Sequence, residues 1–275
     1  MTRTISAIAL ILSLSAGCAT VSQINLISTP QEQEMGRQFS REVEKEVRLI
    51  RDPLVASYVD DLGQLLAKHS QRTDIPYYIQ VVDTDEVNAF ALPGGYLYVN
   101  RGLIQTAENE SELAGVMGHE IGHVVGRHGA RQMTKALGLQ VLLGAVAGQD
   151  PGLARQVAAE VAGVGAGLTL LKYGREAERE ADGYAVQEAY DAGIAPEGMA
   201  TFFEKLLALH DEAPEEGGIA RLFSTHPPTR ERVEQVRVDI ARLPAKKGLA
   251  KDSRRFQKVK AYLNEKYPMK KKAKK

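Results

Sequence analysis

The chain has 275 residues, a formal net charge of zero, 44% hydrophobic residues and one cysteine. This length fits one large domain or two, and a single cysteine excludes an internal disulfide framework. The charge is uneven, because residues 241–275 hold 14 Lys and Arg against 2 acids. We expect a basic C-terminal extension there. Its end, Lys270-Lys-Lys-Ala-Lys-Lys275, is either a solvated tail without a partner or a segment that meets anionic lipid or lipopolysaccharide, and we do not expect nucleic-acid binding.

The first residues resemble a bacterial lipoprotein signal. Arg3 precedes a short apolar stretch, Ile5 to Leu14, which is below the roughly 20 residues that span a bilayer. Ser15-Ala16-Gly17 then leads to Cys18, with Ser15 where a lipobox usually has Leu. We predict a signal peptide over 1–17, lipidation of Cys18 and a tether over 18–28. Ala19 rather than Asp follows the cysteine, which by resemblance to Gram-negative sorting rules implies the outer membrane, facing the periplasm.

The predicted elements alternate between a few strands and many helices. Pro30 and Pro53 follow N-cap residues and open two helices, and Pro93-Gly94-Gly95 is a turn signal between two strands. The last helix is expected after Pro228. The full set is helices 30–49, 53–70, 110–128, 131–147, 153–172, 174–193 and 197–211, and strands 77–82, 87–91 and 96–100. The expected class is α+β, predominantly α-helical, with a small sheet before the 110–128 helix.

The helix over 110–128 carries the most informative motif, His119-Glu120-Ile-Gly-His123. Residues four apart share a helix face, so two imidazoles can hold one zinc ion at about 2.0–2.1 Å each. Glu120 then lies beside the metal, where it can take a proton from water whose pKa zinc lowers to about 7. A solvated polar helix face is the simpler alternative.

The surroundings of the motif favour a buried helix. Asn109 with Glu112 forms a start similar to a capping box, and apolar residues follow at helical spacing. Gly118, Gly122 and Gly126 recur every four residues. Glycine within a helix costs about 1 kcal/mol relative to alanine, so close approach by another backbone is the simplest explanation.

Zinc needs a third protein ligand, for which the sequence offers two candidates. His128 is one, but the metzincin pattern requires a His at position 129, which is Gly. We therefore expect His128 at a helix end or on the surface. Glu178 is the other, and Asp182, one turn later, can accept the spare N–H of a ligating His. Glu176 and Glu180 are expected to pair with Arg175 and Arg179, and a wholly solvated charged helix is the alternative.

Together these motifs resemble the zinc metallopeptidases that include HtpX and the CAAX prenyl proteases. Asn88-Ala-Phe-Ala-Leu-Pro-Gly-Gly95 is similar to the segment before the zinc helix of that family, and Ser224-Thr-His226-Pro-Pro-Thr-Arg230 is similar to its late Thr-His-Pro motif. The resemblance implies a peptidase domain over 29–240, one zinc ion, Glu178 as third ligand, Glu120 as general base and Asp182 in support. It also implies that His226 lies near the metal.

Several roles remain open from sequence. His226 is the first candidate for a donor to the developing oxyanion, with Arg230 behind it, or it occupies the fourth zinc position in a resting state. Asn88, Ala89 and Phe90 belong to a strand whose exposed edge can pair with an extended peptide, or they form an ordinary hairpin.

The expected function is a zinc endopeptidase, anchored in the bacterial envelope, that degrades unfolded or misassembled envelope proteins. The alternative is a non-catalytic lipoprotein that uses the site as a structural metal centre or acts as a chaperone. The intact Glu120 favours the enzyme, because a structural site does not need it.

Overall fold

The computed structural model describes residues 25–136, 173–212 and 225–269. The predicted signal peptide, Cys18, the 153–172 helix, most of the 131–147 helix and the Lys270–Lys275 tail lie outside these ranges. Two compact units are present, Met1–Glu32 with Gly129–Leu170, and Gln33–His128 with Leu171–Lys275. In the first unit residues 129–136 are helical, and the Leu26 N–H donates to Thr134 Oγ1 at 3.1 Å. The second unit contains the candidate site.

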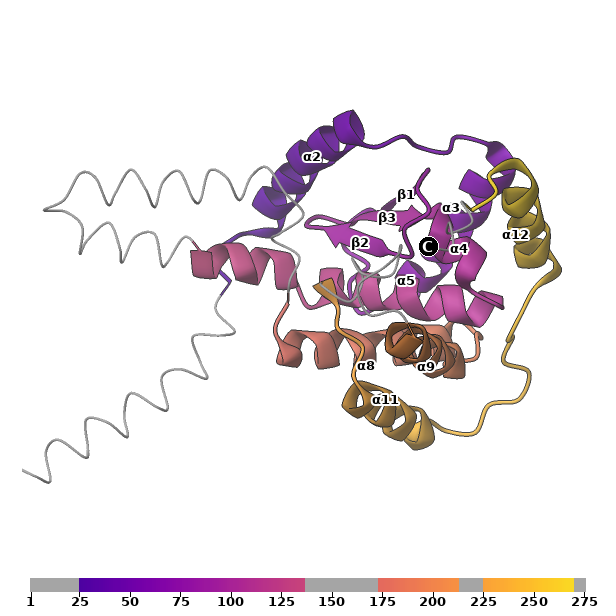
Figure 1. Cartoon of the computed structure of the whole chain (residues 1–275). Helices are drawn as coiled ribbons and strands as arrows, with labels where there is room; N and C mark the ends of the chain where they lie inside the picture. Colours follow the sequence, from indigo (N-terminus) through magenta and orange to yellow (C-terminus); the bar gives the residue numbers. More distant parts are fainter. Residues whose placement is uncertain (1–24, 137–172, 213–224, 270–275) are drawn as a thin grey trace, which may run out of the picture. The chain divides into compact units, whose positions relative to one another are not determined.

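The class predicted from sequence is confirmed, since helices predominate and a three-stranded sheet precedes the helix of the His motif (Figure 1). Most predicted boundaries agree to within about three residues. Two short elements were not predicted, the helices α4 and α12. The described elements in chain order are α2 (Thr29–Glu46), α3 (Pro53–Lys68), β1 (Tyr78–Val82), β2 (Ala89–Leu92), β3 (Tyr96–Asn100), α4 (Arg101–Thr106), α5 (Glu110–Val125), α8 (Arg175–Asp191), α9 (Glu197–Glu212), α11 (Arg230–Arg242) and α12 (Arg254–Lys266).

The sheet has the order β1-β3-β2, with β1 parallel and β2 antiparallel to β3. Gly94 and Gly95 close the β2–β3 hairpin with φ of 78° and 92°, a conformation that favours glycine. The predicted hairpin is therefore confirmed, and β2 is one of the two edge strands. Its four residues are buried rather than exposed, so the edge is covered in this state.

Helix α5 lies between the sheet and helices α8 and α9 in the second unit (Figure 1). Asn109 caps it, because the Asn109 side chain accepts the Glu112 N–H at 3.1 Å, and Glu112 in turn accepts the Glu108 N–H. A Cβ on Gly118 would lie 3.3 Å from Ala185 Cα, and one on Gly122 would lie 2.7 Å from Ala181 O. The prediction of close backbone approach is thus confirmed at these two glycines, and it sets α8 antiparallel to α5.

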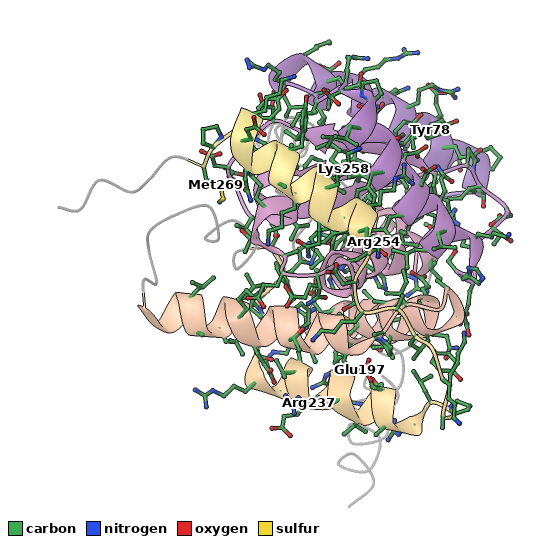
Figure 2. All side chains as sticks on the ribbon, turned by 90° about the vertical axis from the view of Figure 1, so that its right-hand side faces the viewer. Tyr78, Glu197, Arg237, Arg254, Lys258 and Met269 are labelled. Carbon is green, nitrogen blue, oxygen red and sulfur yellow. The ribbon has the colours of Figure 1, made fainter. Side chains whose placement is uncertain are left out.

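Helix α12 shows that the basic C-terminal segment does more than extend into solvent. Ser253 caps it, and Phe256, Val259 and Leu263 are fully buried in the main core at helical spacing. Arg254 and Lys258 lie on its exposed face (Figure 2). The expectation that the helix after Pro228 is the last one is therefore wrong. These three apolar residues recur at helical spacing in the sequence, which is the signal that could have predicted this helix. The many charged residues around them obscured that signal.

None of the helices in the described ranges is both long enough and apolar enough to cross a bilayer.

Glu188 of α8 is a buried acid that the sequence analysis did not single out. Its side chain is 2% exposed, and neither carboxylate oxygen has a hydrogen-bond partner among the described residues. Burial raises the pKa of Glu188 well above its ordinary value, and the charge of His119 opposes that rise only in part. An unpaired buried carboxylate is costly, so Glu188 holds a proton in the folded state.

We predict that Glu188 makes the folded protein less stable as pH rises. The unfolded chain releases this proton above about pH 4.5 while the folded chain retains it, so stability is lost up to the raised folded pKa, with a limiting slope of about 1.4 kcal/mol per pH unit. Glu188→Gln removes this loss. Denaturant unfolding of wild type and variant between pH 5 and 8 measures it, with the exposed Glu176→Gln as control. Parallel curves for wild type and Glu188→Gln contradict the assignment.

Candidate metal centre

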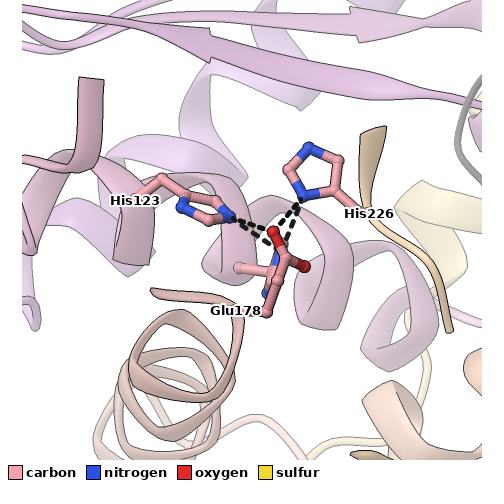
Figure 3. Close-up of side chains that lie close together, drawn as sticks. His123, Glu178 and His226 are labelled. Carbon is pink, nitrogen blue, oxygen red and sulfur yellow. Dashed lines mark hydrogen bonds and ion pairs between the residues drawn. The ribbon is translucent and has the colours of Figure 1, made fainter. Parts of the chain in front are cut away.

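Four buried side chains from three parts of the chain converge at one point. His119 and His123 come from α5, Glu178 from the first turn of α8 and His226 from the segment before α11. One ligand atom from each lies within 4.8 Å of all the others. Figure 3 shows His123 and His226 on either side of the Glu178 carboxylate, with their rings directed toward it.

The spacing of the donor atoms matches a tetrahedral ion. His119 Nε2 lies 3.0 Å from His123 Nε2 and 3.3 Å from His226 Nδ1. Glu178 Oε1 lies 3.0 Å from His226 Nδ1 and 3.5 Å from His123 Nε2. Ligands at about 2.0–2.1 Å from a tetrahedral ion are separated by about 3.3 Å. These four separations are close to that value, and all the donor atoms lie within 4.8 Å of one another.

The two helix imidazoles differ in charge at this point. Burial lowers the pKa of His123 well below its ordinary value, so that ring is neutral. Burial also lowers the pKa of His119, but Asp182 and Glu178 outweigh that effect and raise it to about 9. Without a metal, His119 is therefore protonated at neutral pH, with a hydrogen on Nε2 as well as on Nδ1. Because metal ligands must be deprotonated, metal binding displaces that proton.

Glu120 lies beside the donor group and is held by the sheet. Its Oε2 accepts the N–H of Ala91 on β2 at 3.2 Å. Its Oε1 has no hydrogen-bond partner within the described ranges, and His226 Nε2 lies 3.6 Å away. Burial raises the pKa of Glu120. One oxygen thus orients the carboxylate while the other remains available for proton transfer.

Asp182 lies where the sequence placed it, since its Oδ1 is 2.8 Å from His119 Nδ1, on the side of the ring opposite the donor nitrogen. Arg232 of α11, which sequence reasoning missed, contacts Asp182 through two nitrogens at 2.7 and 2.8 Å. It also lies 2.8 Å from Glu178 Oε2 and donates to the Pro227 carbonyl oxygen. Arg230, the predicted oxyanion support, is exposed instead. Thr229 caps α11, so the helix phase turns position 232 inward and position 230 outward.

His128 lies at a helix end, one of the two positions predicted for it. It is 3% exposed rather than at the surface, and its Nδ1 lies 2.7 Å from His123 Nδ1. Its Nε2 lies 3.1 Å from Glu180 Oε2, a carboxylate that was expected to pair with Arg175 or Arg179. Arg179 instead pairs with Glu231 of α11. Asn88 and Phe90, predicted to bind substrate, are buried at and beside β2.

Comparison with known proteins identifies the family. The sequence matches the pattern of peptidase family M48 over residues 53–239, a range that contains the His motif, Glu178 and His226. The chain belongs to peptidase family M48. The family resemblance inferred from its motifs is thus confirmed.

Several bacterial relatives share the same region. The M48 chain is 34% identical over 220 residues to the beta-barrel assembly-enhancing protease of Escherichia coli (strain K12), covering 77% of this chain and 44% of the relative. It is 31% identical over 193 residues to metalloprotease YcaL of the same organism, covering 68% and 73%. Metalloprotease LoiP, also from that strain, is 33% identical over 162 residues, covering 59% and 62%. The chain thus spans less than half the length of the first of these relatives.

We predict that Arg232→Ala destabilises the fold strongly. The change leaves the buried Asp182 and Glu178 carboxylates without their guanidinium, a loss of about 3–5 kcal/mol for a broken buried ion pair. Denaturant unfolding of the metal-loaded protein measures it. The matched control is Arg230→Ala, at the exposed position two residues earlier, for which we expect less than about 0.5 kcal/mol. Equal effects of the two substitutions contradict the assignment of Arg232.

Proposed function

We propose that this chain is a zinc-dependent endopeptidase, anchored as a lipoprotein in the bacterial envelope, that degrades unfolded or misassembled envelope proteins. The observation that carries the proposal is the convergence of His119, His123 and Glu178 on one point beside Glu120. Two imidazoles and a carboxylate at tetrahedral spacing are a donor set that suits catalytic zinc. We assign one zinc ion per chain to these three residues, with Asp182 fixing the His119 ring.

The reaction then follows from the positions of the protein groups. The chemistry that zinc supplies when bound is polarisation of the scissile carbonyl and a lower pKa for water. Glu120 accepts a proton from the attacking water, whose oxygen bonds to the carbonyl carbon. As the C–N bond breaks, Glu120 returns a proton to the leaving amide nitrogen. The Ala91 N–H keeps Glu120 Oε2 in place. Glu120 Oε1 is therefore the oxygen that accepts the proton from water and later gives a proton to the leaving nitrogen.

His226 has two faces at this site, which supports a mixed role. Its Nδ1 is within the donor group, 3.0 Å from Glu178 Oε1, and its Nε2 lies 3.6 Å from Glu120 Oε1. In this state the His226 ring occupies the place beside Glu120 that water or substrate needs in order to react. We propose that it closes the resting site, that substrate displaces it, and that it can then donate to the oxyanion.

The edge of the sheet suits an extended substrate. The Asn88 carbonyl oxygen accepts the Asn100 N–H. Backbone groups alternate along an antiparallel pair, so the backbone N–H and C=O of Phe90 point toward β3, whereas those of Ala89 and Ala91 point away from it. Pairing at this edge reads main chain rather than side chains, which suits unfolded proteins. Because β2 is buried, an opening step precedes binding.

The envelope assignment rests on the N-terminal segment and on the names of the relatives. One relative is a beta-barrel assembly-enhancing protease, which supports envelope proteins as the substrate class. The alternative, a chaperone with a structural metal, leaves unexplained the free Glu120 oxygen beside the donors.

The central test combines metal content with casein degradation. We expect Glu120→Gln to keep stoichiometric zinc and lose activity by at least about 10²-fold, since proton transfer of this kind contributes 10²–10⁴-fold. Glu178→Ala should lose zinc, and Glu176→Gln, an exposed change on the same helix, should match wild type. Wild-type rates in Glu120→Gln favour the chaperone. Unchanged zinc affinity in Glu178→Ala refutes the ligand set.

His226→Ala separates the proposed roles of that residue. A residue that only closes the site predicts kcat at or above wild type on a small unfolded substrate. A donor to the oxyanion predicts a kcat loss of about 10²–10³-fold. For the mixed role we expect a smaller kcat loss with a lower KM. If rate, zinc affinity and inhibitor binding are all unchanged, His226 plays no part at the site.

Cys18→Ala tests the anchor. We expect the wild-type protein to fractionate with the outer membrane, with acylated Cys18 as its first residue by mass spectrometry. The variant should remain unprocessed or become soluble. A variant that still fractionates with membranes at the mature size contradicts lipidation of Cys18.

A further inference from the structure

We propose that His128 and Glu180 are positioning residues that prepare His123 to bind the metal. The inference rests on the proposed function only in taking His123 as a ligand. Glu180 Oε2 lies 3.1 Å from His128 Nε2, and His128 Nδ1 lies 2.7 Å from His123 Nδ1. His123 Nε2 is the atom that joins the donor group. A carboxylate, a second imidazole and the ligand thus form one continuous chain.

The direction of the hydrogen bonds follows from the chemistry of each group. An ionised carboxylate only accepts, so His128 Nε2 carries a hydrogen and donates to Glu180. A neutral His128 then has a bare Nδ1, which can only accept. His123 Nδ1 must therefore donate, which leaves the lone pair of His123 Nε2 free for a cation. The opposite tautomer of His123 would place a hydrogen where the metal binds.

The local backbone is shaped to hold the His128 ring in this position. Arg127, with φ of 53°, is the only residue other than glycine with positive φ in the described ranges. Such a conformation is uncommon outside glycine, and strain of this kind collects at functional sites. It ends α5 and turns the chain back, so that His128 reaches His123, five residues earlier.

Gly126 provides a second, independent indication. A Cβ at this position would overlap the His128 ring, so only glycine leaves room for it. Gly126 itself has ordinary helical φ and ψ of −68° and −5°. Conformation does not demand glycine here, and the third glycine of the predicted ridge therefore serves the ring rather than contact with another helix.

His119 has an equivalent arrangement, because its Nδ1 contacts Asp182, which Arg232 holds. Both helix ligands are thus oriented from behind by a group that ends in a carboxylate. Such partners fix the tautomer of a ligating imidazole, and their loss typically costs 10–100-fold in metal affinity. His123 differs in having an imidazole inserted between it and the carboxylate.

The experiment measures zinc affinity by competition with a chromophoric chelator, and the visible spectrum of the Co²⁺-substituted protein. We expect His128→Leu to lose 10–100-fold in affinity and to shift the Co²⁺ spectrum. His128→Asn keeps an acceptor near the Nδ1 position and should recover most of the affinity. Glu180→Ala should also weaken binding, whereas Glu176→Ala, which removes an exposed acid from the same helix, should not.

Gly126→Ala keeps the proposal testable if His128→Leu does not fold. Alanine suits the helical backbone, so the variant should still fold, although displacement of the buried ring costs some stability. Zinc affinity should nevertheless fall, because the new methyl group displaces the ring. Unchanged zinc affinity and Co²⁺ spectra in both Gly126→Ala and Glu180→Ala would overturn the proposal. Failure of the proposed function differs, because His119→Ala and Glu178→Ala would then also retain zinc.

Discussion

The close contact between α5 and α8 is the constraint on which the rest of the site depends. Gly118 and Gly122 let the backbone of α8 approach at Ala185 and Ala181, where larger residues would hold the helices apart. One turn from this contact, Glu178 reaches the nitrogens of His119 and His123. A separation larger by one methyl group would move the carboxylate out of range of a tetrahedral ion. Helix packing and metal chemistry are therefore one requirement in this protein.

That contact also concentrates charge in a dry interior. Glu178, Asp182 and Glu120 are all buried, and Arg232 and His119 supply the opposing charge. Arg232 suits this task because its planar group can contact two carboxylates and a carbonyl at once, whereas lysine presents a single point charge. Asp182 has its pKa lowered despite burial because Arg232 and His119 contact it directly. A bound metal would add positive charge to a site where protein groups already oppose the negative charge of the carboxylates.

Much of this arrangement could be predicted from sequence, for definite physical reasons. Helical periodicity and local caps depend on neighbours along the chain, so the α5 helix, the glycine contact and the pairing of Glu178 with Asp182 could be read directly. Arg232 and His128 could not, because each depends on the rotation of a helix or on one strained residue. A shift of two positions separates Arg232 from Arg230, and the cap at Thr229 decides it. Arg127 decides the orientation of His128, and its conformation has no residue-type signature.

The hydrogen bond between the Ala91 N–H and Glu120 has a consequence for how a peptide lies along β2. An added strand would find one of the outward N–H groups of that edge already engaged by the catalytic carboxylate. A peptide paired with β2 would therefore lack that one hydrogen bond beside Glu120, and its main chain would be held only on either side of the gap. A carbonyl in that gap has no sheet partner to give up before it is attacked. On the function proposed above, the edge strand would therefore position an extended peptide with one main-chain hydrogen bond missing beside Glu120.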